Sequence, residues 1–194
     1  MSPSPTGERA KKRTVSTGSD MIRPPRPEDA RALAVVHITS WQHAYTDDFP
    51  SEFLESLDME RRVAWFGSQI EKGSGLLVAD GDDGPVGFCF FGESGDEGWG
   101  EVFSIYVHPE EWGEGHGHRL LGAAEAELID RGFDKALLWV LDSNRRARDF
   151  YEREGWVLGK PIRLEEIGGR QVTEVRYERV FEGRRRPDPG RRDR

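Results

Sequence analysis

The spacing of apolar residues after position 27 is typical of helices. A short strand is expected at residues 21–25, followed by a helix that begins at Pro27–Asp29, where a proline and two acidic residues suit a first turn. The apolar face of this helix comprises Leu33, Ala34, His37, Ile38, Trp41 and Tyr45. A second helical stretch is expected over residues 51–70, with a break near Asp58.

Short apolar runs of a different kind come next. The runs GLLVAD (75–80) and PVGFCFFG (85–92) are joined by the turn GDDG, which predicts a β-hairpin. Residues 99–107 alternate between two faces and predict a third strand of this group. The run KALLWVL (135–141) is apolar throughout, as expected for a strand that is buried on both faces.

Two further helices and two strands complete the pattern. One helix follows the glycines near position 115, and the other covers about 143–154, with Gly155 as its C′ residue. Strands near 156–163 and 171–181 close the chain. The order β-α-α-β-β-β-α-β-α-β-β predicts an α/β domain in which a mixed central sheet is flanked by helices.

Composition limits this domain to the middle of the 194-residue chain. Residues 1–20 and the Arg-rich residues 182–194 are rich in Ser, Pro, Gly or charge and poor in apolar side chains, so both ends are expected to be disordered tails. The folded domain is therefore expected to span residues 21–181. Cys89 is the single cysteine, which excludes a disulfide framework and favours a reducing cytoplasm.

Charge and hydropathy exclude several partners. The tails carry +2 and +3 of a net charge of −8, so residues 21–181 carry −13. Nucleic acid is not expected as the main partner, because phosphate binding needs a concentrated basic surface. No apolar run is long enough to cross a membrane, and the first residues lack the layout of a secretory signal. An acidic surface suits a cationic substrate.

Glycines alternate with other residues in the stretch EEWGEGHGHRLL (110–121), just before a predicted helix. Backbone N–H groups at a helix N-terminus bind anions, and glycines let a phosphate approach them closely. Two familiar phosphate motifs do not fit. A dinucleotide fingerprint needs glycine at His118, and a Walker loop needs Lys and Ser/Thr at Ala123 and Ala124. The local pattern leaves a phosphate site and an unspecialised turn as alternatives.

The same stretch offers a third interpretation, a metal site on Glu114, His116 and His118. Side chains at every second position lie on the same side only in an extended segment, whereas this segment enters a helix. The spacing of the three residues also matches no common group of zinc ligands. No metal is therefore expected.

The segments YVHPEEWGEGHGHRLL and NRRARDFYEREGW resemble the two core motifs of the GCN5-related N-acetyltransferases, and the predicted order of elements matches that family across the domain. The family's phosphate signature, Q/R-x-x-G-x-G/A, falls on residues 112–117, with Trp112 in place of the usual Gln or Arg. The resemblance implies that acetyl-coenzyme A (acetyl-CoA) is bound by backbone groups. Those near the pyrophosphate are Gly113, Glu114, Gly115, His116, Gly117 and His118, and those along the pantetheine arm are Ile105, Tyr106 and Val107.

The second motif implies two further roles. Asn144 matches the asparagine that hydrogen-bonds the cofactor arm, although a helix N-cap would also explain it. Tyr151 matches the tyrosine that protonates the departing thiolate, and its alternative is a core aromatic beside Phe150. His118 and Arg119 could assist the phosphates electrostatically.

A base must free the acceptor amine of its proton. Glu101 lies eleven positions before Trp112, a spacing that resembles family members whose catalytic glutamate opens this strand. Other members carry a glutamate on the next strand, where this chain has Trp139, and others use water chains. Trp41 and Tyr45, with His43, Asp47 and Asp48, are candidates for the acceptor pocket, with a place in the core as the alternative.

The sequence therefore predicts a cytoplasmic N-acetyltransferase, with acetyl-CoA as co-substrate and a small-molecule amine as the slightly favoured acceptor. Direct attack in a ternary complex is expected, because no cysteine lies in the motifs to carry the acetyl group. A protein or peptide N-acetyltransferase and a non-catalytic coenzyme A-binding module are the alternatives. A homodimer is a further expectation from the family.

Overall fold

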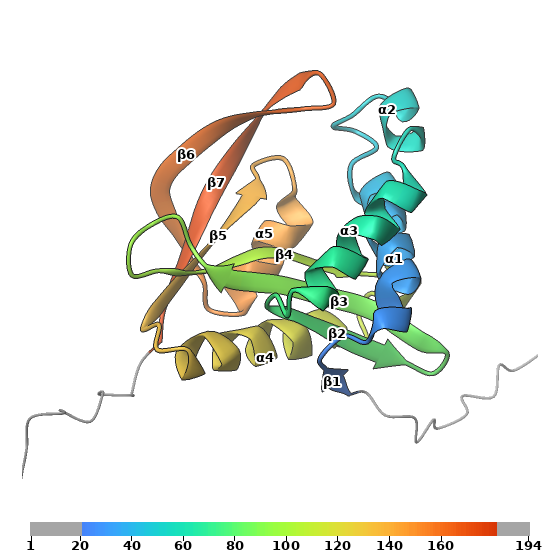
Figure 1. The fold of residues 1–194 in the computed structure, drawn as a ribbon. Coiled ribbons are helices and arrows are strands. Elements are labelled where there is room, and N and C mark those ends of the chain that lie inside the picture. The colour runs from blue at the N-terminus through green and yellow to red at the C-terminus, as the bar shows by residue number, and fades with distance from the viewer. Residues whose placement is uncertain (1–20, 182–194) are drawn as a thin grey trace, which may run out of the picture.

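The computed structural model describes residues 21–181 as an α/β domain, and both predicted tails lie outside the described residues. The order of elements is the predicted one, with the second helical stretch divided in two as expected near Asp58 (Figure 1). The helices are α1 (Ala30–Ala44), α2 (Ser51–Glu55), α3 (Met59–Glu71), α4 (His116–Asp130) and α5 (Arg145–Arg153), with 3-10 turns η1 (Pro27–Asp29) and η2 (Pro109–Glu111). The strands are β1 (Ile22–Arg23), β2 (Leu76–Gly81), β3 (Gly84–Glu93), β4 (Gly100–Val107), β5 (Lys135–Leu141), β6 (Val157–Ile167) and β7 (Arg170–Val180).

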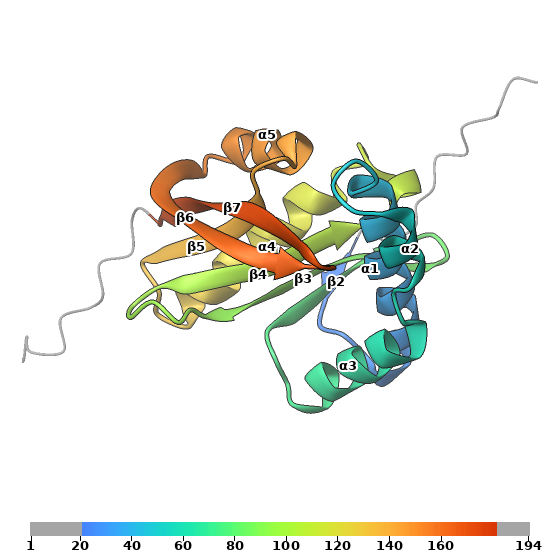
Figure 2. The same cartoon turned by 90° about the horizontal axis from the view of Figure 1, so that it is seen from above.

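Within the described residues, the strands form one seven-stranded sheet in the order β1-β2-β3-β4-β5-β7-β6. Strands β4 and β5 are parallel, and the other neighbours are antiparallel. Helices α1 and α3 cover one face of the β2–β4 half, and α4 covers the other (Figures 1 and 2). None of the described helices is both long and apolar enough to cross a membrane.

The parallel pair β4–β5 is short, and this opens the sheet. Pairing runs only from Gly100 opposite Ala136 to Val102 opposite Leu138, although both strands continue. Phe103 is an extra residue in β4, because Phe91 faces Val102 while Phe90 faces Ser104. Such a bulge bends its strand away from the regular ladder. Beyond it, β4 and β5 diverge and leave a gap between their carboxyl ends.

Strand β6 is longer than the sequence predicted, and β7 is shifted by one residue from its predicted position. β6 extends to Ile167 rather than residue 163, and β7 begins at Arg170, so that only Gly168 and Gly169 separate them. Both glycines have positive φ (57° and 73°), the conformation of a two-residue hairpin turn. The acidic end of β6 obscured the strand, because Glu165 and Glu166 are uncommon in strands.

His37 makes the stability of the fold depend on pH. Its ring is buried against Trp41, Phe88 and Tyr106, and its Nδ1 has no hydrogen-bond partner in the described structure. Burial, with a smaller contribution from nearby Arg62, lowers the pKa of His37 to about 3. Below pH ~6.5 His37 binds a proton in the unfolded chain but not in the folded chain. The stability of the fold therefore decreases as the pH drops from about 6.5 toward 3.

We expect this group to remove about 2 kcal/mol between pH 6.5 and 5. Urea unfolding of the wild type and of His37→Phe across this range measures the effect as the difference between the two slopes. His43→Gln, which changes an exposed histidine of the same helix, is the control and should keep the wild-type slope. Equal slopes for wild type and His37→Phe would contradict the assignment.

Candidate active site at the opening of the sheet

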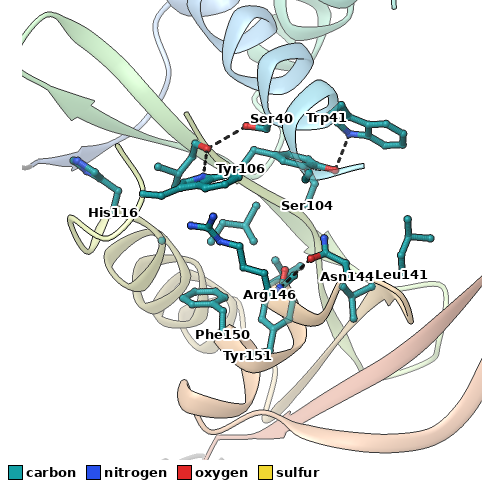
Figure 3. Close-up of a pocket in the computed structure, with 18 of the residues that line it drawn as sticks. Ser40, Trp41, Ser104, Tyr106, His116, Leu141, Asn144, Arg146, Phe150 and Tyr151 are labelled. Atoms are coloured by element: carbon teal, nitrogen blue, oxygen red, sulfur yellow. Dashed lines mark hydrogen bonds between the residues drawn. The ribbon is translucent and has the colours of Figure 1, made fainter. Parts of the chain in front are cut away.

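A cavity of about 800 Å³ lies where β4 and β5 diverge. Its walls come from α1, the outer halves of β4 and β5, the N-terminal end of α4, α5 and the β6–β7 hairpin. Side chains from these distant segments point toward one another across the cavity (Figure 3). The cavity therefore brings the two sequence motifs to one place.

The glycine segment lines one end of the cavity. Gly113 and Gly115 have φ values of 95° and 82°, and α4 begins immediately afterwards at His116. When residues with left-handed backbone conformation alternate with other residues, successive N–H groups point to the same side. This backbone arrangement binds anions. All of residues 113–118 except Glu114 line the cavity. The segment therefore has the geometry of a phosphate cradle at a helix N-terminus.

The two histidines of this segment have separate partners. His116 is buried, and its Nδ1 lies 3.0 Å from Arg119 Nη2, which only donates, so Nδ1 accepts and the proton lies on Nε2, 3.5 Å from Glu111. His118 is exposed, and its Nδ1 lies 2.7 Å from Glu154. Among residues 21–181, no three His, Cys, Asp or Glu side chains form a group that could hold a metal ion.

Trp112 fixes the cradle to the sheet. Its Nε1 donates to the carbonyl of Val107 at 2.7 Å, and the same carbonyl accepts from Ser40 Oγ at 3.1 Å. His43 packs edge-on against the indole ring. The side chain at this position thus joins α1, β4 and the glycine segment, a role that the family signature did not suggest.

The outer end of β4 presents free backbone groups to the cavity. The carbonyl of Val107 points away from β3, because it accepts from Ser40 and Trp112. Orientation alternates along an antiparallel strand, so the N–H and C=O groups of Ile105 face the same gap. The amides of Ile105 and Val107 therefore face the gap that β4 and β5 leave between them. Tyr106 lies between these two residues, and its side chain contacts Trp41 on the face of the sheet that α1 covers.

Arg146 crosses the cavity from α5. Its guanidinium carbon lies 3.3 Å from the centre of the Trp112 ring, and the side chain extends from the helix toward the middle of the cavity (Figure 3). Burial lowers the pKa of Arg146, with nearby Arg153 adding to the effect, but arginine stays charged at any physiological pH. Within residues 21–181 Arg146 forms no salt bridge, so a cation stands beside the cradle where an anionic ligand would meet it.

Asn144 caps α5 and reaches Tyr45 across the cavity. Its Oδ1 accepts from the Ala147 amide at 3.0 Å, which confirms the N-cap interpretation, and its Nδ2 donates to the Tyr45 hydroxyl at 3.2 Å. Trp41 donates to the Tyr106 hydroxyl at 2.8 Å. Trp41 and Tyr45 both line the cavity, and Tyr45 is also packed with Phe49. Of the residues named with them, His43 lines the cavity, and Asp47 and Asp48 do not.

Tyr151 lies at the inner end of the cavity, one turn along α5 from Ala147. It is buried against Trp156 and Tyr177 and also lines the cavity, so the core and site interpretations both apply. Burial raises the pKa of its phenol well above the usual range, and Cys89 and Tyr45 add to the effect. The hydroxyl is therefore protonated at neutral pH.

The structure does not bring Glu101 to the cavity. Its carboxylate accepts from Ser94 Oγ at 2.8 Å, in the loop that joins β3 to β4, and burial raises its pKa. Glu174 of β7 does line the cavity, near Tyr45, and it accepts from Arg163 Nε at 2.5 Å. Sequence reasoning missed Glu174, because it alternates with apolar residues as an ordinary exposed strand residue would.

Comparisons with known proteins agree with this arrangement. Residues 38–156 match the model of the Acetyltransferase (GNAT) family. The chain is 31% identical over 163 residues to the uncharacterized N-acetyltransferase YuaI of Bacillus subtilis, covering 76% of this chain and 90% of that protein. A GCN5-related N-acetyltransferase from Rhodopseudomonas palustris superposes with a TM-score of 0.69 at 25% identity, over 86% of this chain and 99% of that one. The PaiA N-acetyltransferase of Thermoplasma acidophilum, solved in complex with coenzyme A, superposes with a TM-score of 0.64 at 22% identity, over 83% and 98%.

Proposed function

Because the chain belongs to the GNAT family of acetyltransferases, we propose that it transfers the acetyl group of acetyl-CoA to the primary amine of a small molecule. The observation that carries this proposal is the cavity at the opening of the sheet. One end of this cavity is the anion cradle. The other end is a pocket with aromatic walls, and Glu174 is the carboxylate among the residues that line it. A panel of amines, assayed by release of free thiol from acetyl-CoA, tests it.

The donor would lie along the gap between β4 and β5. The amides of residues 113–118 would hold its pyrophosphate at the start of α4, and Arg146 would turn from Trp112 toward the phosphates. The N–H and C=O groups of Ile105 and the N–H group of Val107 would pair with the pantetheine arm, as another strand would. These residues fit coenzyme A in charge and in backbone access. The donor supplies the activated acetyl group as a thioester.

The residues at the inner end would then handle charge and protons. Amide N–H groups of β4 face the thioester carbonyl and stabilise the negative charge that forms on its oxygen when the neutral amine attacks the carbonyl carbon. The carbon–sulfur bond breaks, and Tyr151 gives its proton to the departing sulfur. The proton that the amine loses passes to a base and returns to the phenol through solvent. Direct attack is favoured because Cys89 is fully buried in the core and lines no part of the cavity.

The acceptor would bind beside the β6–β7 hairpin. Trp41, Tyr45 and Trp139 supply aromatic walls there, and Glu174 supplies negative charge. The hairpin tip closes this end, because Arg170 donates to the carbonyl of Asp48 and Gly168 lies against the ring of Phe53. A pocket with aromatic walls that is bounded on one side by this hairpin suits a small amine better than a lysine of a folded protein.

We propose Glu174 as the carboxylate that binds the acceptor's ammonium group and receives its proton, and we keep Glu101 as the second candidate. Glu174→Gln should lower kcat/KM for the acceptor by about 100-fold or more, in the range of general-base effects, without changing affinity for coenzyme A. Glu101→Gln should change kcat/KM by less than about threefold, because its carboxylate lies outside the cavity. The reverse ranking of the two variants would return the role to Glu101.

Two alternatives are outcomes of the amine panel. Turnover only with peptides would indicate a protein or peptide N-acetyltransferase. Binding of coenzyme A without turnover of any amine would indicate a coenzyme A-binding module. We include a cytoplasmic location and a homodimer in the proposal: a single buried thiol is typical of reducing compartments, and the family resemblance favours two copies.

A further inference from the structure

Strand β6 is an edge strand with an exposed apolar surface. It is the last strand of the sheet and pairs only with β7, so that its other side faces outward (Figure 1). Ile162 and Leu164 are 65% and 61% exposed, although both are branched apolar residues that favour strands. An exposed edge of this kind is a template for pairing with another strand.

The register of the hairpin shows which backbone groups are free. Ile167 and Arg170 flank the two-glycine turn, and pairs that exchange hydrogen bonds alternate with pairs that do not. Counting back from the turn, Arg163 and Glu165 bond to β7. The N–H and C=O groups of Ile162, Leu164 and Glu166 therefore point away from β7. The free backbone groups and the exposed apolar side chains thus belong to the same residues.

The residues of this edge strand can pair favourably with the same residues of a second copy that runs antiparallel to it. In KPIRLEE (160–166), Lys160 precedes the apolar pair Ile162 and Leu164, Arg163 lies between the two, and two acidic residues follow them. If a second copy runs antiparallel about an axis at Arg163, Ile162 lies opposite Leu164 of the second copy. Lys160 then lies opposite Glu166 of the second copy. Both pairs occur twice, and Ile162, Leu164 and Glu166 lie on one face of the strand.

We propose that two copies of this chain associate through antiparallel pairing of β6 with β6, which joins their sheets into one. The apolar pairs would exclude water at the centre, and the Lys160–Glu166 pairs, which lie just beyond the regular ladder, would add contacts of opposite charge at both ends. In the described structure neither Lys160 nor Glu166 forms an ion pair within its own chain. Both charges are therefore available to a second copy.

Contacts on the opposite face permit this pairing. Two Arg163 side chains would approach each other at the axis, but each is held by Glu174 at 2.5 Å and Glu165 at 3.5 Å and lies over the Trp139 ring. The irregular register between Leu158 and Ile162, together with Pro161, ends the ladder on that side. The paired segment is therefore short, and we expect a dimer that dissociates on dilution.

Charge reversal tests the proposal by sedimentation velocity over a range of protein concentrations. The wild type should dimerise, and Lys160→Glu and Glu166→Lys should each weaken dimerisation by about tenfold or more, since each creates two like-charge contacts. A mixture of the two variants should recover affinity, because the mixed dimer has one native and one reversed pair, and so should the double variant. Within one chain the two positions are too far apart to pair, so recovery requires contact between copies.

Further variants separate this surface from other causes. Lys72→Glu makes the same change of charge at an exposed residue of another element and should leave dimerisation unchanged. Leu164→Thr should weaken dimerisation while circular dichroism shows an intact fold. A wild type that stays monomeric at all concentrations would overturn the proposal. A dimer that is indifferent to Lys160, Leu164 and Glu166 changes would overturn it as well. Neither result bears on acetyl transfer, which is assayed separately.

Discussion

Replacing Tyr151 with phenylalanine should lower kcat by about 100-fold or more, because a positioned general acid contributes about 10²–10⁴ to rate. The structure supports this role through the place of the phenol at the inner end of the cavity, on the helix that Asn144 caps. Without its hydroxyl, the departing thiolate would leave unprotonated. Affinity for coenzyme A should change by less than about threefold, since the cradle is formed by other segments.

The pH dependence of the same reaction distinguishes an acid that stays protonated from one that titrates. Burial raises the pKa of Tyr151 above its usual range, so the acid form persists as pH rises. Activity should therefore show no alkaline decline from this residue, and any ionisation seen in kcat should belong to the acceptor amine or its base. A basic limb that disappears in Tyr151→Phe would contradict this assignment.

Tyr177→Phe provides the matched control for loss of a buried hydroxyl. Tyr177 packs against Tyr151, but its hydroxyl donates to Glu152 at 2.6 Å and accepts from Arg148, and it lines no part of the cavity. We expect this variant to lose stability by about 1–3 kcal/mol while kcat stays within about twofold. Equal losses of kcat in the two variants would show that Tyr151 acts through packing rather than as an acid.

Features that are formed by residues close together in the chain could be predicted from the sequence. The strand, glycine turn and helix around residues 101–130 share one local pattern, and the anion cradle follows from backbone geometry that the glycines themselves impose. Asn144 could be predicted as a cap because it stands at a helix start, and its proposed role toward the cofactor rests on the family resemblance. Local chemistry and periodicity are sufficient for such features.

Features that depend on distant segments could not be predicted. Glu174 reaches the cavity only because β7 lies beside β5, and Arg146 meets Trp112 only because α5 folds over the opening. The position of the Glu101 carboxylate depends on the bulge at Phe103 and on the hydrogen bond from the Ser94 hydroxyl in the preceding loop. Spacing from Trp112 could not reveal either. The acceptor end is therefore the part of the site about which the sequence was least informative.

Replacing Gly115 with valine should have the largest effect on donor binding. The residue has a φ of 82°, and left-handed backbone in a β-branched residue is a strained outlier that costs on the order of 1–3 kcal/mol. An added Cβ would lie 3.1 Å from Arg119 Nη1, which donates to the Glu114 carbonyl, and Nη2 of the same guanidinium contacts His116. Relief of either strain would rotate the N–H groups away from the phosphates. Loss of two charge-assisted hydrogen bonds would raise the Kd for coenzyme A by about 100-fold or more.

Gly122→Ala is the control on the same helix. Its Cβ would meet open space at ordinary helical φ, away from the cavity, so coenzyme A affinity should stay unchanged and stability should rise slightly. Calorimetric titration gives the Kd values, and thermal melting shows whether Gly115→Val is still folded. Gly115→Asn adds a graded case, because asparagine tolerates left-handed backbone and should lose less affinity than valine. If folded Gly115→Val binds coenzyme A as the wild type does, the pyrophosphate does not bind at this segment, because its N–H groups could not have kept their direction through the substitution.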